Sequence, residues 1–159
     1  MGIKPKFSNG TVADQVKAFQ VRLEKATVVM LKYLGEELVR YAKENHNYQD
    51  QTGNLTNSIG YAVVKQGKIL TYGWGNQPGE GAAEGMKVAT QMAATLPNTF
   101  SLIIVAGMNY AAYVEAKGYN VILPAQLKAM KDFPATIMRI QNAALKKANE
   151  AFSQNDQLL

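Results

Sequence analysis

The sequence predicts an α+β fold, in which a small, mainly antiparallel sheet is flanked by long N-terminal and C-terminal helices. Apolar residues recur every three or four positions through two long stretches, 11–44 and 135–152, which is typical of amphipathic helices. Between them lie two β-prone runs joined by a glycine-containing turn, and an apolar run of strand length. Nothing divides the 159 residues, so we expect a single domain, 1–159, whose ends (1–10 and 153–159) are flexible.

The first helix is expected to begin near Thr11 or Asp14 and to end near Glu44. Its apolar residues are spaced three, four or seven apart, while lysine and arginine occupy other positions of the helical wheel. The stripe, which we expect to face the core, comprises Val16, Phe19, Leu23, Met30, Leu34, Leu38 and Tyr41.

Residues 59–72 are expected to form an antiparallel hairpin. Side chains alternate between two faces from Ile59 to Val64, the chain turns at 66–68, and a second strand runs from Ile69 to Tyr72. Gly67 suits the positive φ that a tight hairpin loop requires.

The segment 74–96 is predicted to be a glycine-rich loop followed by a short helix that ends before Pro97. Its "GEGAAEG" run superficially resembles a phosphate-binding loop, but its spacing differs from GxGxxG and Glu80 and Glu84 would repel phosphate. We therefore interpret it as a mobile loop, or as an arm that becomes ordered on a partner.

The second half of the chain is predicted to hold a strand, one or two helical turns, a short strand and a helix. The run at 100–106 is apolar enough for a central strand with both faces covered. Helical turns follow, with Asn109 as N-cap and Gly118 as the C-terminal glycine, and "YNVIL" (119–123) is a short strand candidate. The chain is helical again from Pro124, with a kink or break at 132–134 because proline lacks an amide donor.

Composition narrows the classes of function. The net charge is +5 and the pI is about 9.3, which favours an acidic partner and keeps a basic nucleic-acid-binding α+β module as an alternative function. The basic residues are dispersed, however, and a solvated surface explains them as well. No signal-like or membrane-spanning apolar run is present, so we expect a soluble cytosolic protein with no membrane partner.

Catalysis has few candidate residues. The chain has no cysteine and one histidine, His46, so the usual thiolate nucleophile and zinc sites are excluded. A hydrolase stays an alternative only because His46, Asp50 and Ser58 are close in sequence. Glu115 is expected to cap a helix or to pair with a neighbouring element or subunit. We expect no enzyme activity, no catalytic residue, no metal and no cofactor.

Two segments together resemble the tail-completion, or head-tail joining, family of long-tailed bacteriophages. Members have D-T-G-x-L-x-x-S-I after the first helix and Y-A-x-Y-V-E-x-G before the last. The residues that match the first element are Asp50, Thr52, Gly53, Leu55, Ser58 and Ile59, with Gln51 inserted; those that match the second are Tyr110, Ala111, Tyr113, Val114, Glu115 and Gly118, with Lys117 inserted. Residues 74–96 look like an insertion relative to this pattern.

The chemistry of the first element also favours a structural turn. Gly53 permits a sharp reversal, Asp50 and Thr52 can bind nearby amides, and Leu55 returns to the core. Ser58 and Ile59 would then begin the strand.

The resemblance implies a structural virion protein of the phage neck, made in the host bacterial cytoplasm. Such a protein would form a homo-oligomeric ring, of hexamer type, between the head connector and the tail-tube proteins, with DNA passing through it. Head-to-tail contacts that close would build the ring. Our candidate oligomer contacts, besides the sheet edge, are Tyr72, Trp74, Glu80 and Glu84.

Overall fold

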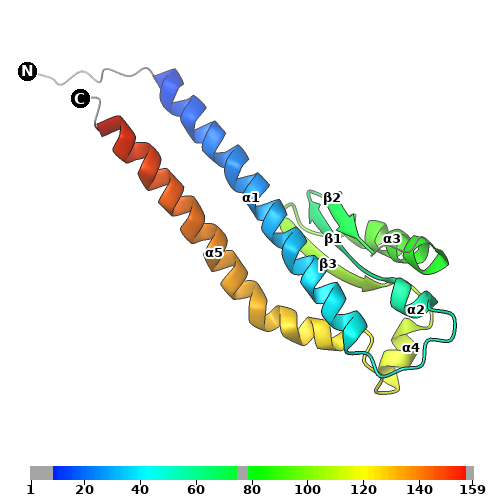
Figure 1. Cartoon of the computed structure of the whole chain (residues 1–159). Coiled ribbons are helices and arrows are strands. Elements are labelled where there is room, and N and C mark those ends of the chain that lie inside the picture. Colours follow the sequence, from blue (N-terminus) through cyan, green and yellow to red (C-terminus); the bar gives the residue numbers. More distant parts are fainter. Residues whose placement is uncertain (1–8, 75–78, 157–159) are drawn as a thin grey trace, which may run out of the picture.

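The structure, a computed structural model, describes residues 9–74 and 79–156, and its arrangement is the α+β fold predicted from the sequence (Figure 1). Two long helices flank a three-stranded sheet, and three shorter helices connect the parts. The elements are α1 (Asn9–Glu44), α2 (Asn54–Asn57), β1 (Ile59–Lys65), β2 (Lys68–Gly73), α3 (Glu80–Ala93), β3 (Phe100–Ala106), α4 (Ala111–Ala116) and α5 (Leu123–Asp156).

The sheet is antiparallel with the order β2-β1-β3, so β1 lies in the centre. The hairpin predicted for β1 and β2 is confirmed. Gln66 and Gly67 have φ values of 53° and 72°, and two successive positive φ angles are what a two-residue turn between twisted strands requires. The register shifts between Val63 and Val64, where Leu70 is left without a partner as a β-bulge.

Helices cover both faces of the sheet, which explains why β1 is buried along almost its whole length. On one face Ile59, Tyr61 and Val63 pack with the α1 leucines in the larger core cluster. On the other face Ala62 and Val64 pack with Trp74 and residues of α3 in a second cluster. The alternation predicted for this strand therefore separates two cores instead of a core and solvent.

The far ends of α1 and α5 extend beyond the sheet as a two-helix arm (Figure 1). Leu31, Leu34 and Leu38 of α1 face the core and are buried, whereas Val12 and Val16 in the arm are 43% and 50% exposed. The prediction that the apolar stripe of α1 faces the core is thus correct for Leu34 and Leu38 but not for Val16 in the arm, nor for Tyr41, which is 37% exposed.

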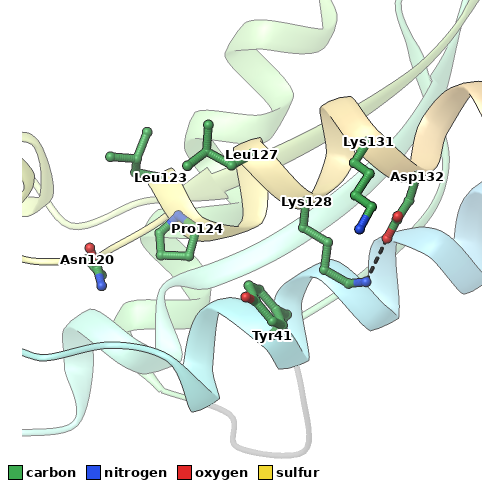
Figure 2. Close-up of a pocket in the computed structure, with 8 residues that line it drawn as sticks. All are labelled: Tyr41, Asn120, Leu123, Pro124, Leu127, Lys128, Lys131 and Asp132. Carbon is green, nitrogen blue, oxygen red and sulfur yellow. Dashed lines mark hydrogen bonds and ion pairs between the residues drawn. The ribbon is translucent and has the colours of Figure 1, made fainter.

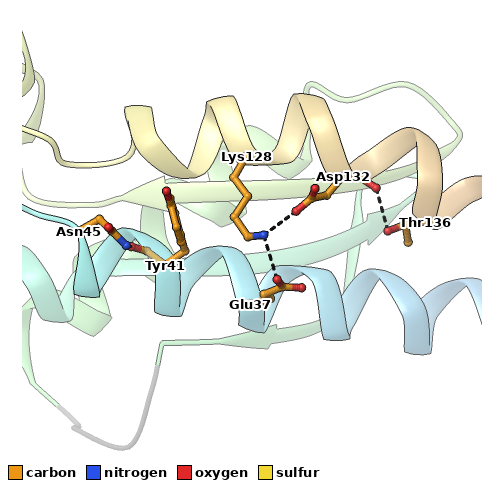
Figure 3. Close-up of polar contacts among 6 residues, drawn as sticks. All are labelled: Glu37, Tyr41, Asn45, Lys128, Asp132 and Thr136. Carbon is orange, nitrogen blue, oxygen red and sulfur yellow. Dashed lines mark hydrogen bonds and ion pairs between the residues drawn. The ribbon is translucent and has the colours of Figure 1, made fainter.

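A lysine joins the two long helices (Figure 3). Lys128 Nζ of α5 lies 3.0 Å from Glu37 Oε1 of α1 and 2.6 Å from Asp132 Oδ2, and 5.6 Å from the centre of the Tyr41 ring. The hydrogen bonds to Asp132 and Glu37 raise the pKa of Lys128, so the cation is stabilised where α5 begins to run along α1.

Two strand predictions were wrong. The apolar run at 100–106 forms β3, but β3 is an edge strand; both of its faces are nevertheless covered by helices, so its composition resembles that of a central strand. The "YNVIL" segment forms no strand, because the backbone amides of Val121, Ile122 and Leu123 are bound to the Glu115 carboxylate.

The helix predicted from Pro124 onward is one continuous α5, and it does not break at Pro134. Figure 1 shows the helix bent where yellow passes into orange, the colour range of this proline. The hydroxyl of Thr136 donates to the carbonyl oxygen of Asp132 at 3.1 Å, as often happens at a helix bend. Within the described parts of the chain, no helix has the length and apolar character that crossing a bilayer would need.

Candidate functional site

The first family-like segment makes the turn between α1 and β1. Gly53 has a φ of 75°, in the left-handed region that glycine adopts without steric penalty. Asp50 Oδ2 accepts a hydrogen bond from the amide of Thr56 at 2.7 Å, and Thr52 Oγ1 accepts one from the amide of Asn54 at 3.3 Å. These amides belong to α2, a helix of 4 residues that is too short to provide hydrogen-bond acceptors for its own amides. Asp50, Thr52 and Gly53 therefore have the turn-forming roles that the sequence indicates.

The Asp50 carboxylate is held in its charged form. Burial tends to raise its pKa, but hydrogen bonds from the amides of Thr56, Gly53 and Leu55 and from the Thr56 hydroxyl outweigh this effect. The pKa of Asp50 consequently lies below its ordinary value of 3.8. A permanent negative charge is thereby placed against the amides of α2.

Replacing Asp50 by alanine should lower the free energy of unfolding by about 1–2 kcal/mol, because the α2 amides lose their acceptor. Since the folded-state pKa of Asp50 is lowered, its contribution is present above the unfolded pKa and is lost as pH falls through the folded pKa. Urea unfolding at a series of pH values should show the gap between wild type and Asp50→Ala closing below about pH 4. Gln51→Ala, at an exposed neighbour, is the control. A gap independent of pH would contradict this role for the carboxylate.

Ser58, which is fully buried, joins the first segment to the ends of the other two strands. Its carbonyl oxygen accepts hydrogen bonds from Trp74 Nε1 at 3.1 Å and from the amide of Gly107 at 3.2 Å. Its hydroxyl donates to the carbonyl oxygen of Leu55 at 2.7 Å and accepts from the amide of Met108 at 3.4 Å. One serine thus connects α2, the residue after β2 and the residues after β3.

The second family-like segment forms α4 and its C-terminal turn. Ala111 is buried and Val114 packs against the larger core cluster, while Tyr110 and Tyr113 are 38% and 65% exposed. Tyr110, not Asn109, is the N-cap residue. Gly118 has a φ of 84° and follows the helix end, as expected for a C-terminal glycine.

Glu115 caps the beginning of α5. Its carboxylate oxygens accept hydrogen bonds from the amides of Val121, Ile122 and Leu123 at 3.3, 2.9 and 3.1 Å. The first amides of a helix have no partner inside it, and a negative charge there is favourable. Of the two roles expected for Glu115, the helix cap is the one that the structure contains.

Tyr48 brings the two segments together, and the sequence reasoning missed it. Its ring is buried in the same cluster as Ala111 and Val121, and its hydroxyl lies 3.2 Å from Thr56 Oγ1. Burial raises the pKa of Tyr48, so its hydroxyl stays protonated. A lone aromatic residue inside a polar run was the available signal. Both segments therefore meet at one end of the molecule, where α2 and α4 lie (Figure 1).

The three residues of the hydrolase alternative have structural partners. The His46 ring stacks on the Tyr48 ring with 4.4 Å between the ring centroids. Its Nδ1 lies 3.2 Å from the Tyr48 carbonyl oxygen. The Ser58 hydroxyl donates a hydrogen bond to the Leu55 carbonyl oxygen, and Ser58 is fully buried. A nucleophilic serine needs its proton directed at a base, so this arrangement does not support acyl transfer. In the described ranges no three His, Asp or Glu side chains gather as a metal site would require.

The four candidate oligomer contacts have different environments. Tyr72 is 58% exposed on the edge strand β2, and Glu80 is exposed while accepting a hydrogen bond from Asn54 Nδ2. Glu84 is half-buried and pairs with Lys87 at 3.3 Å. Trp74 is only 7% exposed and packs between the sheet and α3, so the monomer does not present it as a surface contact.

The "GEGAAEG" run is mostly helical, which corrects the loop prediction for this part. Gly79 is the N-cap and α3 begins at Glu80. A Cβ on Gly81 would lie 2.3 Å from the Asn54 carbonyl oxygen, and one on Gly85 would lie 2.0 Å from Trp74 Nε1. Gly81 therefore lets α3 approach α2 closely, and Gly85 lets it approach Trp74 and Ser58 at the sheet. The remainder of the predicted loop, 75–78, lies outside the described residues.

A shallow groove lies between α1 and the beginning of α5 (Figure 2). Two lysines line it, Lys128 and Lys131, and Lys128 is paired with Asp132 and Glu37. Leu123 and Leu127 stand on the opposite side of α5 from Tyr41 in this view. The residues that line the groove are Tyr41, Asn120, Leu123, Pro124, Leu127, Lys128, Lys131 and Asp132.

Comparison of the chain with protein-family models, with curated proteins and with solved structures gave no match. The resemblance to the tail-completion family therefore depends on the residues of the two segments alone.

Proposed function

We propose that this chain is a non-enzymatic structural protein of the phage neck that forms a ring between the head connector and the tail tube. The observation that carries the proposal is the junction of the two family-like segments. Their polar residues bind backbone amides and carbonyls, as Asp50, Ser58 and Glu115 do. These side chains stabilise the backbone conformation. In this proposal the protein acts by binding other proteins through its surface.

The two edges of the sheet supply a route to a ring. β2 lies at one edge and β3 at the other, and edge strands carry unpaired backbone groups that can pair with another chain. Leu70 and Tyr72 on β2 are 47% and 58% exposed. In this proposal β2 of one copy pairs with β3 of the next, head to tail, and the contact closes into a ring.

Negative-stain imaging of the purified chain, concentrated and at moderate salt, should show rings of uniform diameter. The double variant Leu70→Lys with Tyr72→Glu should abolish them, because charges would replace apolar surface at the β2 edge. Thr90→Glu, at an exposed position of α3, is the matched control and should leave the rings intact.

The alternative, a nucleic-acid-binding module, gives a different result. Arg22 and Lys25 on α1 are exposed and offer a modest basic surface. Tight DNA binding in a gel shift that weakens steeply with salt, together with an absence of rings at every concentration, would overturn the proposal.

A further inference from the structure

The smaller core cluster lies between the sheet and α3, and α3 contributes only small side chains to its buried part. The large buried members belong to the strands and to the residue after β2: Val64, Ile103, Val105 and Trp74. The buried residues of α3 are all glycine or alanine: Gly81, Gly85, Ala89 and Ala93. Met86 and Val88, which pack against the cluster, are only partly buried. The sheet and Trp74 therefore supply most of the apolar surface, and α3 covers it.

α3 is a weak helix, and few polar contacts hold it to other elements. Gly81 and Gly85 lie inside it, and each glycine makes an interior helical position about five times less favourable than alanine would. Its N-cap residue, Gly79, has no side chain that could bind the first amides. Among the described residues, one side-chain hydrogen bond joins α3 to another element, from Asn54 Nδ2 to Glu80 Oε2 at 3.1 Å, and it is exposed. We therefore expect α3 to lose its helical structure when it leaves the sheet.

The rest of the fold does not depend on α3 for its main packing. The larger core cluster occupies the opposite face of the sheet, and α3 contributes none of the described side chains in it. Trp74 is bound by other elements, since its Nε1 donates to the Ser58 carbonyl oxygen at 3.1 Å and its own carbonyl oxygen accepts from Lys43 Nζ at 2.9 Å. Proteins open in such cooperative units, with free energies below that of global unfolding.

We propose that α3 is a lid that opens and unfolds as one unit while the sheet, α1 and α5 stay packed. The lid closes directly on the Trp74 ring, because a Cβ on Gly85 would lie 2.0 Å from Trp74 Nε1. Figure 1 shows α3 away from both long helices, so it can leave without displacing either of them. Opening uncovers one side of Trp74 and the apolar strand surface that includes Val64 and Ile103. The lid thereby controls whether a partner can reach this surface.

The lid goes beyond the proposed ring, because it uses neither the β2 edge nor the β3 edge of the sheet. A ring can form with α3 closed, and α3 can open in a monomer. The two proposals therefore fail independently.

Thiol labelling under native conditions tests the lid, since the chain has no cysteine of its own. Three alanines, each 0% exposed, form a matched set: Ala89 in α3, Ala62 on the strand surface beneath it, and Ala125 in the larger cluster. Each is replaced by cysteine in a separate chain, which is then mixed with a thiol reagent. Ala89→Cys and Ala62→Cys should react at least about tenfold faster than Ala125→Cys, because only the last requires global unfolding. Equal rates in all three chains, or a fast rate at Ala89→Cys alone, would overturn the proposal.

A substitution in the larger core separates local opening from global unfolding. Ile59, which is 0% exposed in that cluster, is replaced by valine in the Ala89→Cys and Ala125→Cys chains. Ile59→Val should make global unfolding about fivefold more frequent, but it removes the same methylene group from the lid-open and lid-closed states. Labelling of Ala125→Cys should quicken by about that factor, whereas labelling of Ala89→Cys should stay within about twofold. An equal increase in both chains would refute a lid that opens alone.

Hydrogen exchange of the unsubstituted chain gives a test that needs no cysteine. At low urea the α3 amides should exchange at least about tenfold faster than the β1 amides, and with a weaker dependence on urea, because local opening exposes less surface than global unfolding. Near the unfolding midpoint the two sets of amides should converge. If the α3 amides follow the β1 amides in rate and urea dependence at every concentration, the proposal is overturned, even where a cysteine variant fails to fold.

Discussion

Replacing Gly85 by alanine is expected to lower the free energy of unfolding by about 1–3 kcal/mol. In an exposed helix the same change raises stability by about 1 kcal/mol, because alanine favours helix. Here the new methyl group would lie 2.0 Å from Trp74 Nε1 and 2.7 Å from the Ser58 carbonyl oxygen. Both partners of the buried Trp74–Ser58 hydrogen bond would have to move, and α3 would be pushed from the sheet.

Thermal and urea unfolding of Gly85→Ala measure this loss. Gly79→Ala is the matched control, because a Cβ there has nothing within 4 Å and its extended backbone suits any residue. The control should stay within about 0.5 kcal/mol of wild type. A Gly85→Ala protein as stable as the control would mean that α3 does not lie this close to the sheet.

Replacing Glu115 by alanine is expected to lower the free energy of unfolding by about 2–3 kcal/mol, because three amides lose a charged acceptor. Glu115→Gln keeps one acceptor oxygen and loses the charge, so its loss should be roughly half as large. Chemical unfolding measures both variants. Glu44→Ala, at the exposed end of α1, controls for removal of a surface carboxylate.

The location of the Glu115 effect is as informative as its size. Hydrogen exchange should quicken first at the amides of Val121, Ile122 and Leu123, because these are the amides that the carboxylate binds. Exchange at β1 should change little by comparison. Loss of protection spread evenly over the whole chain would argue against a local cap.

The elements that the sequence predicted well are those whose local pattern agrees with their packing. The β1–β2 hairpin is an example, since alternation and the turn glycine Gly67 both specify it. The position of β3 could not be predicted, because an edge strand covered by helices on both faces has the composition of a central one. In the same way, the α1 stripe does not reveal where the sheet ends and the arm begins.

Parts of the candidate site were predictable for a similar reason. Asp50, Thr52 and Gly53 act within a few residues of themselves, so the turn could be inferred locally. Gly85 and Trp74 act on each other across the fold, and a glycine used for close approach looks the same in sequence as one used for flexibility. The burial of Trp74 and the helical start of α3 were consequently missed.

Because of the two-helix arm, the free energy of local unfolding is expected to differ along the molecule. Beside the sheet, α1 residues such as Leu38 are enclosed by several elements, whereas Val12 and Val16 near the arm tip remain half in water. Each turn that frays from the tip uncovers little additional apolar surface, so it costs little free energy. The end of the molecule that holds the two family-like segments is then the last to unfold, and the arm tip is the first.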